Sequence, residues 1–186
     1  MSYQASKIAR ATVVTFLGGA LYVTGTEIDA FAVNAYTRVG IADEAVVNIE
    51  THGGRCLDLD HGKKENGVRI QQWTCNGTEA QKWRMTQTSD SSFEIRSVVS
   101  DKCLEVEDSS GVAGAAVQQW KCTGGKQMHW QLVATDVERQ EFQLRPMHTT
   151  DRCLDIENYT SGNGAKAQQW YCNQTDPQFF RIRPSV

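Results

Sequence analysis

The sequence contains the same motif three times. Each copy begins with a cysteine, an apolar residue and an acid, and ends with Gln-Gln-Trp, one further residue and a second cysteine. The copies run from Cys56 to Cys75, from Cys103 to Cys122 and from Cys153 to Cys172, so the cysteine spacing is identical in all of them. A motif that recurs every roughly 20–50 residues indicates a repeat architecture, in which each unit needs its neighbours to bury its apolar face.

The cysteines indicate disulfides. All six lie within the three copies, and an even number at regular spacing is typical of a disulfide framework formed in an oxidising compartment. The alternative, a metal site, is disfavoured because no two cysteines stand at C-x-x-C spacing and no histidine pair stands at ligand spacing. The sequence therefore predicts neither a metal nor a cofactor.

The charge of the chain argues against a nucleic-acid partner. There are 19 basic and 22 acidic residues, which gives a formal net charge of −3. No stripe of Lys and Arg of the kind that binds a phosphate backbone is present.

The N-terminal segment has the features of an export signal. Lys7 and Arg10 precede an uncharged stretch at 11–26, and Ala30-Phe31-Ala32 follows as a small-x-small cleavage site. The stretch is short for a membrane span, which needs about 20 apolar residues, so no stable membrane insertion is expected. We predict a signal peptide at 1–32 and a secreted protein; a buried helix of the folded domain is the alternative.

The remainder of the chain is predicted to form one domain. Residues 33–43 show no strong periodicity and are interpreted as a linker or N-terminal arm. The domain covers 44–186, with repeats at about 44–91, 92–140 and 141–186.

Alternation of apolar and polar residues predicts strands. In Cys56-Leu57-Asp58-Leu59 the two leucines share one face and the acid lies on the other. In the closing strand, Ile70 and Gln72 share one face while Gln71 and Trp73 share the other. If the two strands pair with like faces aligned, then Asp58, Gln71 and Trp73 converge on one patch of the surface. Gly- and polar-rich segments between the strands suit hairpin loops.

Each repeat also has a strand before the motif and a segment after it. The leading strands are expected at 46–50, 93–96 and 142–145, and the closing segments pass through Gln81-Lys82-Trp83, Met128-His129-Trp130 and Gln178-Phe179-Phe180. Four strands in each of three repeats, with almost no helical periodicity, predict an all-β fold.

The pattern C-L-D…Q-x-W-x-C, followed by a second Q-x-W-like element, resembles the ricin B-type lectin family, which includes the family 13 carbohydrate-binding modules. The resemblance covers about residues 44–186. It implies a β-trefoil, which is a six-stranded barrel capped by three hairpins with pseudo-threefold symmetry. It also implies disulfides within repeats (Cys56–Cys75, Cys103–Cys122 and Cys153–Cys172) and a core position for Trp83, Trp130 and Phe180.

The converging residues suit a sugar. An aromatic ring covers the apolar face of a sugar, a carboxylate accepts hydrogen bonds from its hydroxyls, and an amide can both donate and accept. In the family the acid holds sugar hydroxyls and the Trp stacks on the ring. The resemblance thus implies two sites, formed by Asp58, Gln71, Trp73 and Gln81 and by Asp155, Gln168, Trp170 and Gln178.

The second repeat departs furthest from the family pattern. An Asn that precedes the closing Gln in well-formed family sites is absent from all three repeats, where Ala80, Gln127 and Pro177 stand instead. The second repeat also has Glu in place of Asp and Met128 in place of Gln. We expect a weaker site there, formed by Glu105, Gln118, Trp120 and Gln127, or only a structural role for these residues.

Catalysis is not predicted. The acids belong to different repeats, whereas glycosidase carboxylates flank one bond about 5–10 Å apart. No nucleophile elbow or phosphate-binding loop is present.

The sequence predicts a secreted, non-catalytic lectin that recognises galactose- or xylose-type glycans. The alternatives are a cell-binding or scaffold subunit of a multi-chain toxin and a trefoil inhibitor of a hydrolase. Both alternatives expect an exposed apolar patch or a long projecting loop outside the sugar sites.

Three N-x-T sequons also occur, at Asn76, Asn158 and Asn173. They would be glycosylation sites if the host modifies exported proteins.

Overall fold

The computed structural model describes residues 15–17, 20–22, 44–136 and 138–185. Most of the predicted signal peptide (1–32) and all of the predicted arm (33–43) lie outside these residues. Of the signal segment, the structure describes only two short paired strands, β1 (Thr15–Leu17) and β2 (Ala20–Tyr22).

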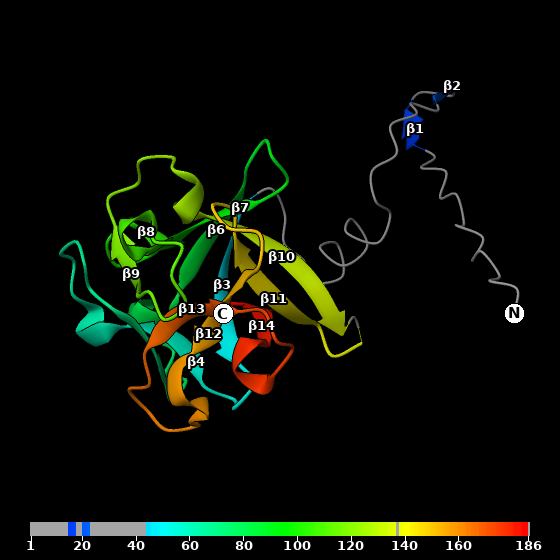
Figure 1. Ribbon diagram of the computed structural model, residues 1–186. Coiled ribbons are helices and arrows are strands. Elements are labelled where there is room, and N and C mark those ends of the chain that lie inside the picture. Colours follow the sequence, from blue (N-terminus) through cyan, green and yellow to red (C-terminus); the bar gives the residue numbers. More distant parts are fainter. Residues whose placement is uncertain (1–14, 18–19, 23–43, 137, 186) are drawn as a thin grey trace, which may run out of the picture.

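The described part of the domain consists of strands joined by loops and single 3-10 turns. The first repeat contributes β3 (Glu44–Thr51), β4 (Cys56–Leu59), β5 (Ile70–Trp73) and β6 (Trp83–Gln87). The second contributes β7 (Phe93–Ser97), β8 (Cys103–Val106), β9 (Val117–Trp120) and β10 (His129–Asp136). The third contributes β11 (Glu141–Pro146), β12 (Arg152–Ile156), β13 (Ala167–Tyr171) and β14 (Phe180–Pro184). The prediction of an all-β fold is confirmed (Figure 1).

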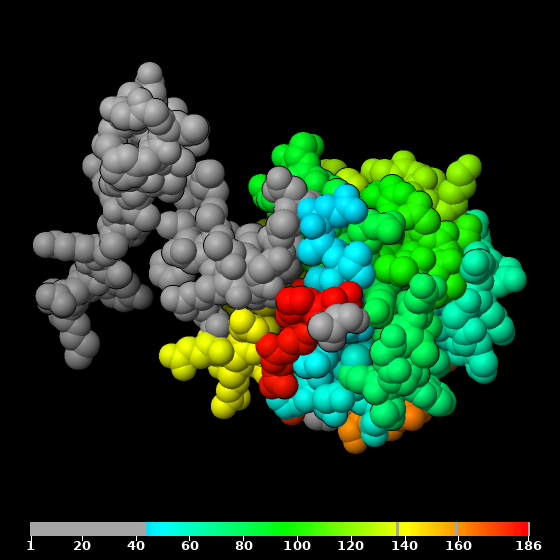
Figure 2. All heavy atoms as spheres, turned by 180° about the vertical axis from the view of Figure 1, so that it is seen from behind, coloured from blue at the N-terminus to red at the C-terminus, as the bar shows by residue number. Residues whose placement is uncertain are grey.

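The first and last strands of the repeats close into a barrel. β3 pairs with β6, β6 with β7, β7 with β10, β10 with β11, β11 with β14, and β14 returns to β3. The second and third strands of each repeat pair as separate hairpins, β4–β5, β8–β9 and β12–β13. The last pairing of the barrel places the red C-terminal strand beside the cyan start of the domain (Figure 2). This arrangement is the predicted β-trefoil.

The core is formed by the apolar faces that alternation predicted. Trp83, Trp130 and Phe180 are completely buried. Both indoles donate a hydrogen bond to the carbonyl of a buried leucine in the first strand of the neighbouring hairpin, Trp83 to Leu57 at 3.0 Å and Trp130 to Leu104 at 2.9 Å. A buried indole N–H needs such a partner, so these aromatics fix each hairpin onto the barrel.

The closing segments differ from the expectation in one respect. Gln81 is not part of strand β6. It ends a 3-10 turn (η2, Glu79–Gln81), and the strand begins at Trp83. The same turn recurs as η4 (Lys126–Met128) and η6 (Asp176–Gln178). The turn directs the side chain of its last residue back under the hairpin of the same repeat.

Each disulfide lies within one repeat. The bonds join Cys56 to Cys75, Cys103 to Cys122 and Cys153 to Cys172, with Cα–Cα distances of 5.0, 5.2 and 5.1 Å. The pairing implied by the family resemblance is therefore present.

The second glutamine of each Gln-Gln-Trp motif joins one repeat to the next. Gln72 Nε2 donates to the carbonyls of Thr160 and Gly162, both at 2.8 Å, in the loop of the third-repeat hairpin. Backbone hydrogen bonds between Gln72 and residues 164 and 165 extend this contact. Gln119 binds the first-repeat loop and Gln169 the second-repeat loop in the same way. The three hairpins thus form a ring in which the third repeat contacts the first.

Candidate functional site

The predicted residues of the first repeat come together on one hairpin. Asp58 on β4 lies directly opposite Gln71 on β5, and Cys56 lies opposite Trp73. Gln71 Nε2 donates to Asp58 Oδ1 at 3.0 Å. Asp58 is 6% exposed, whereas Trp73 is 40% exposed. The arrangement is a recessed acceptor beside an open aromatic face.

Gln81 lies behind this patch. It is completely buried, and its Nε2 donates to Asp58 Oδ2 at 3.1 Å and to the Thr74 carbonyl at 3.0 Å. Its Oε1 accepts from the Asn76 backbone N–H at 2.8 Å. The sequence grouped Gln81 with the carbohydrate-binding residues, but all its polar atoms are used inside the protein. Its role in the structure is to position Asp58 and the loop that follows β5.

The third repeat reproduces this geometry. Gln168 Nε2 donates to Asp155 Oδ1 at 2.8 Å, and Gln178 Nε2 donates to Asp155 Oδ2 at 3.1 Å. Asp155 is 6% exposed, Gln178 is completely buried and Trp170 is 39% exposed. Gln178 also bonds to the backbone of Tyr171 and Asn173, just as Gln81 does in the first repeat.

The second repeat uses different residues for the same purpose. Gln118 Nε2 donates to Glu105 Oε1 at 3.1 Å, and the Gln127 side chain lowers the pKa of this carboxyl and so stabilises its charged form. Met128 occupies the position of Gln81, and its Sδ accepts from the Thr123 N–H at 3.3 Å. Gln127, which the sequence assigned to the weaker second site, thus acts on the carboxylate together with Gln118.

Gln127 can reach Glu105 because Gly125 has no side chain. A Cβ at position 125 would collide with the Gln127 amide. The other two repeats have Thr78 and Thr175 at this position, each bonded to the Asn two residues earlier. In those repeats the Asn Oδ1 accepts from both the N–H and the hydroxyl of the Thr. This turn gives a structural reason for the N-x-T pattern at Asn76 and Asn173.

The carboxyls are similar in their electrostatics. Burial raises the pKa of Asp58 and of Asp155 above the ordinary 3.8, and it raises the pKa of Glu105 above the ordinary 4.5. Hydrogen bonds from the glutamines oppose the increase because they stabilise the charged form. The net effect is a pKa above the ordinary value for each of the three carboxyls.

A hairpin loop of another repeat packs against the indole of each site: the third-repeat loop against the first site, the first-repeat loop against the second, and the second-repeat loop against the third. Gly164, in the third-repeat hairpin, has a φ of 86°, and a Cβ there would lie 3.9 Å from the Trp73 ring. Gly67 lies in the same way against Trp120, and Gly114 against Trp170. The indoles therefore stand against a neighbouring loop, which limits their rotation.

Sequence reasoning missed two contributors. One is the second glutamine of each motif, whose recurrence in all three copies was a signal. The other is Lys166, which reaches across from the third repeat to the first site. Its Nζ lies 2.9 Å from Gln71 Oε1 and 3.1 Å from Asp60 Oδ2. The Lys–Gln contact leaves the Gln71 NH₂ group directed at Asp58.

Comparison with known families agrees with this geometry. A profile described as ricin-type beta-trefoil lectin domain-like matches residues 40–120 and again residues 88–170. The chain belongs to this family. The two matches overlap and together include all three Gln-Gln-Trp motifs. A search of curated protein sequences finds no significant match.

Several solved structures resemble this chain. A designed threefold-symmetric protein, ThreeFoil, is 28% identical with a TM-score of 0.70 over 74% of this chain and 97% of its own. The exo-β-1,3-galactanase 1,3Gal43A of Clostridium thermocellum is 25% identical with a TM-score of 0.71 over 75% of this chain and 30% of its own. A ricin B-like lectin of Macrolepiota procera, solved with lactose, has the same fold at 18% identity, with a TM-score of 0.63 over 75% of this chain and 94% of its own.

A metal site and a membrane-spanning helix are two further features to consider in this ricin-type domain. Glu94, Cys103 and Cys122 are grouped closely enough to suggest a metal site, but both sulfurs belong to a disulfide and are not thiolate ligands. Within the part of the chain that the structure describes, no helix is long and apolar enough to cross a bilayer.

Proposed function

We propose that this protein is a secreted lectin that binds glycans through the first and third repeats and does not modify them. One observation carries the proposal. In both repeats a carboxylate is held on both oxygens by glutamine amides beside an exposed indole. This pre-organised acceptor suits vicinal sugar hydroxyls, and the indole suits the C–H face of the ring.

The proposed sugars are of the galactose or xylose type. The resemblance to the ricin-type family supports this class, and two of the similar proteins are named for a β-1,3-galactan or were solved with lactose. An open site of this size binds one sugar weakly, since about −4 kcal/mol corresponds to only millimolar affinity. Simultaneous contact with several sugars on one surface would supply the useful affinity.

The second repeat is proposed to be the weakest site. Its acid, Glu105, is longer and only 4% exposed. The other sites have Ala80 and Pro177 where the second repeat has Gln127, whose side chain acts on the Glu105 carboxyl. A sugar that enters this site has to compete with that larger polar side chain, which offsets part of what the sugar gains.

Secretion is supported by the disulfides, which form in oxidising compartments. The absence of catalysis is proposed because the three motif acids, Asp58, Glu105 and Asp155, lie in separate hairpins of separate repeats, so no two of them flank one bond.

A glycan array followed by an NMR titration of the indole N–H signals tests this function. Galactose- or xylose-containing glycans should be retained, and the signals of Trp73 and Trp170 should shift before that of Trp120. Saturation of Trp120 at the lowest sugar concentration would reverse the proposed order of sites. Absence of any glycan binding would favour the scaffold or inhibitor alternatives, for which Val112 and Tyr171, 69% and 52% exposed, are the first surface residues to test.

A further inference from the structure

The first site opens into a cavity that extends beyond Asp58, Gln71 and Trp73. Its volume is about 690 Å³, and its lining also includes Gly62, Ala80 and Val99. We call these last three residues the apolar shelf. Ala80 and Val99 are partly buried and pack against the hydrophobic core, so the shelf is a fixed part of the fold.

The shelf exists because three separate loops present small side chains. Gly62 ends the 3-10 turn η1 (Asp60–Gly62), Ala80 lies within η2, and Val99 follows β7 of the second repeat. A Cβ added at Gly62 would lie 3.8 Å from the Ala80 Cβ. A larger residue at position 62 or 80 would therefore take up part of the cavity.

The corresponding place in the second repeat is filled. Ala80 is replaced there by Gln127, a larger polar residue whose side chain lowers the pKa of Glu105. The same backbone hydrogen bond occurs in both places, from the Val98 N–H to the Lys82 carbonyl and from the Met147 N–H to the His129 carbonyl. Val98 and Met147 are therefore equivalent positions. The residue after each of them is also equivalent, so His148 is the counterpart of Val99. His148 Nε2 lies 2.9 Å from the Ser110 carbonyl. Two polar side chains thus stand where the first site has its shelf.

The cavity is larger than one sugar ring requires. At about 30 Å³ for each non-hydrogen atom, which is the share of one molecule in liquid water, a hexose takes up about 360 Å³ at most. Besides the apolar shelf, His61 and Glu79 also line the cavity. A C–H face above Ala80 and Val99, with hydroxyls turned to His61 and Glu79, would match this lining.

We propose that the first site recognises a sugar of at least two residues, with a second, glycosidically linked ring on the apolar shelf. The inference rests on the proposed lectin function and concerns only the first repeat. It assigns Ala80 and Val99 to specificity, because they decide whether a chain or only a single residue is recognised. In the third repeat Pro177 takes the place of Ala80, so the third site is not expected to share this preference.

The test compares monosaccharides with linked sugars on the intact protein. Galactose, lactose, β-1,3-galactobiose, xylose and xylobiose would be titrated, with the Trp73 and Trp170 indole signals reporting the first and third sites separately. We expect at least one disaccharide to bind the first site about tenfold more tightly than its monosaccharide. We also expect the Val99 methyl signals to shift with that disaccharide only. The third site should show a much smaller gain.

Ala80→Leu should abolish the disaccharide gain at the first site, measured as the ratio of disaccharide to monosaccharide affinity in the same variant. Pro177→Leu, at the corresponding third-repeat position, is the matched control and should leave the first-site gain intact. Equal affinity for mono- and disaccharides at the first site, with Val99 signals unmoved, overturns the inference while the lectin function stands. If no sugar binds either site, the proposed function fails together with it.

Discussion

Asp58 and Asp155 are each subject to two opposing effects. Burial disfavours their charged form, while two glutamine amides stabilise it. The net result is a raised pKa for both, which means that the cost of desolvation is the larger effect. A carboxylate in this state is a strong hydrogen-bond acceptor, because little water competes for its oxygens.

The raised pKa makes sugar binding depend on pH. The ionised form accepts hydroxyl hydrogen bonds, so affinity at the first and third sites should fall as the pH is lowered through the raised values, with midpoints above 3.8. A titration calorimetry series across acidic pH measures this. A midpoint at or below 3.8 would contradict it.

Folding stability should respond to these carboxyls in the opposite direction. Because the folded state binds these protons more tightly than the unfolded state, the contribution of each Asp is largest below 3.8 and declines as the pH rises through its folded value. Asp58→Asn should remove the contribution of the first site to the pH dependence of sugar binding and of folding stability. The contribution of the third site should remain unchanged.

The two tryptophans of the first repeat should behave differently on truncation. Trp73 is 40% exposed, whereas Trp83 is completely buried and bonded to Leu57. Trp83→Ala should cost roughly 3–5 kcal/mol of folding free energy, as expected for a large buried aromatic. Trp73→Ala should weaken first-site binding with a much smaller loss of stability. Denaturant unfolding and glycan retention, measured on both variants, distinguish the two roles. Equal destabilisation would show that the Trp73 ring is structural.

At the scale of the elements, the hairpins determine which features the sequence could predict. Alternation within Cys56-Leu57-Asp58-Leu59 was enough to place Asp58, Gln71 and Trp73 on one face, because strand pairing is local. It could not show what Gln72 binds, since its partners Thr160 and Gly162 lie 88 and 90 residues away. Gln81 was grouped with the site residues, but the sequence pattern alone does not show that its amide also bonds to the Thr74 carbonyl and to the Asn76 N–H.

Gln72→Ala should destabilise the contact between the first and third repeats. It removes two side-chain hydrogen bonds to the Thr160 and Gly162 carbonyls, each worth about 0.5–1.5 kcal/mol net. The expected result is a lower denaturation midpoint together with faster amide exchange in residues 160–164.

Gln71→Ala is the matched control for that prediction, because Gln71 bonds to Asp58 and Lys166 rather than to the hairpin loop. It should weaken first-site binding and leave exchange in the 160–164 loop unchanged. If the two variants gave the same exchange pattern, the joining role of Gln72 would be wrong.

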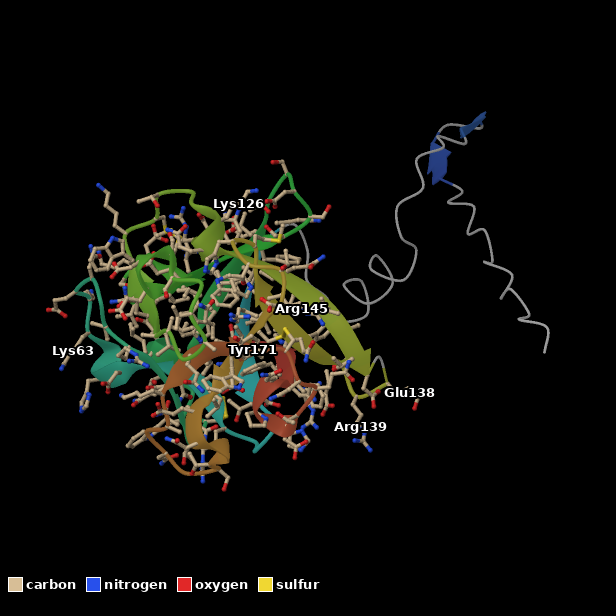
Figure 3. The ribbon with its side chains drawn as sticks, viewed as in Figure 1. Lys63, Lys126, Glu138, Arg139, Arg145 and Tyr171 are labelled. Atoms are coloured by element: carbon tan, nitrogen blue, oxygen red, sulfur yellow. A yellow bond between two sulfur atoms is a disulfide. The ribbon has the colours of Figure 1, made fainter. Side chains whose placement is uncertain are left out.

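At the scale of the whole molecule, the barrel is completed by long-range pairing, while each disulfide acts within one hairpin. The surface loops extend away from this frame, as the positions of Lys63 and Lys126 show, and the β10–β11 turn projects with Glu138 and Arg139 (Figure 3).

The fold could be predicted because three copies of one motif repeat the same information. The apolar shelf could not, because its residues come from loops of two different repeats.

Reduction of the disulfides should lower stability without changing the topology. Each bridge closes a loop of about 20 residues and contributes on the order of 3 kcal/mol by the loop-entropy estimate. Mass spectrometry of a non-reduced digest should recover Cys56–Cys75, Cys103–Cys122 and Cys153–Cys172. Thermal unfolding should then show a large decrease in Tm in reductant. A bridge between repeats, or an unchanged Tm, would contradict this account.

The ring of contacts between the hairpins has a consequence for how the chain can be reconnected. Since β14 pairs with β3, the ends of the domain lie side by side, and the Ser185 N–H donates to the Val46 carbonyl. A circular permutant that begins near residue 92 and joins residue 185 to residue 44 would keep every hairpin beside its original neighbour. A single excised repeat, in contrast, would lack the loop that stands against its own indole. Only as a trimer of such fragments, each supplying that loop to the next, would it rebuild a complete site.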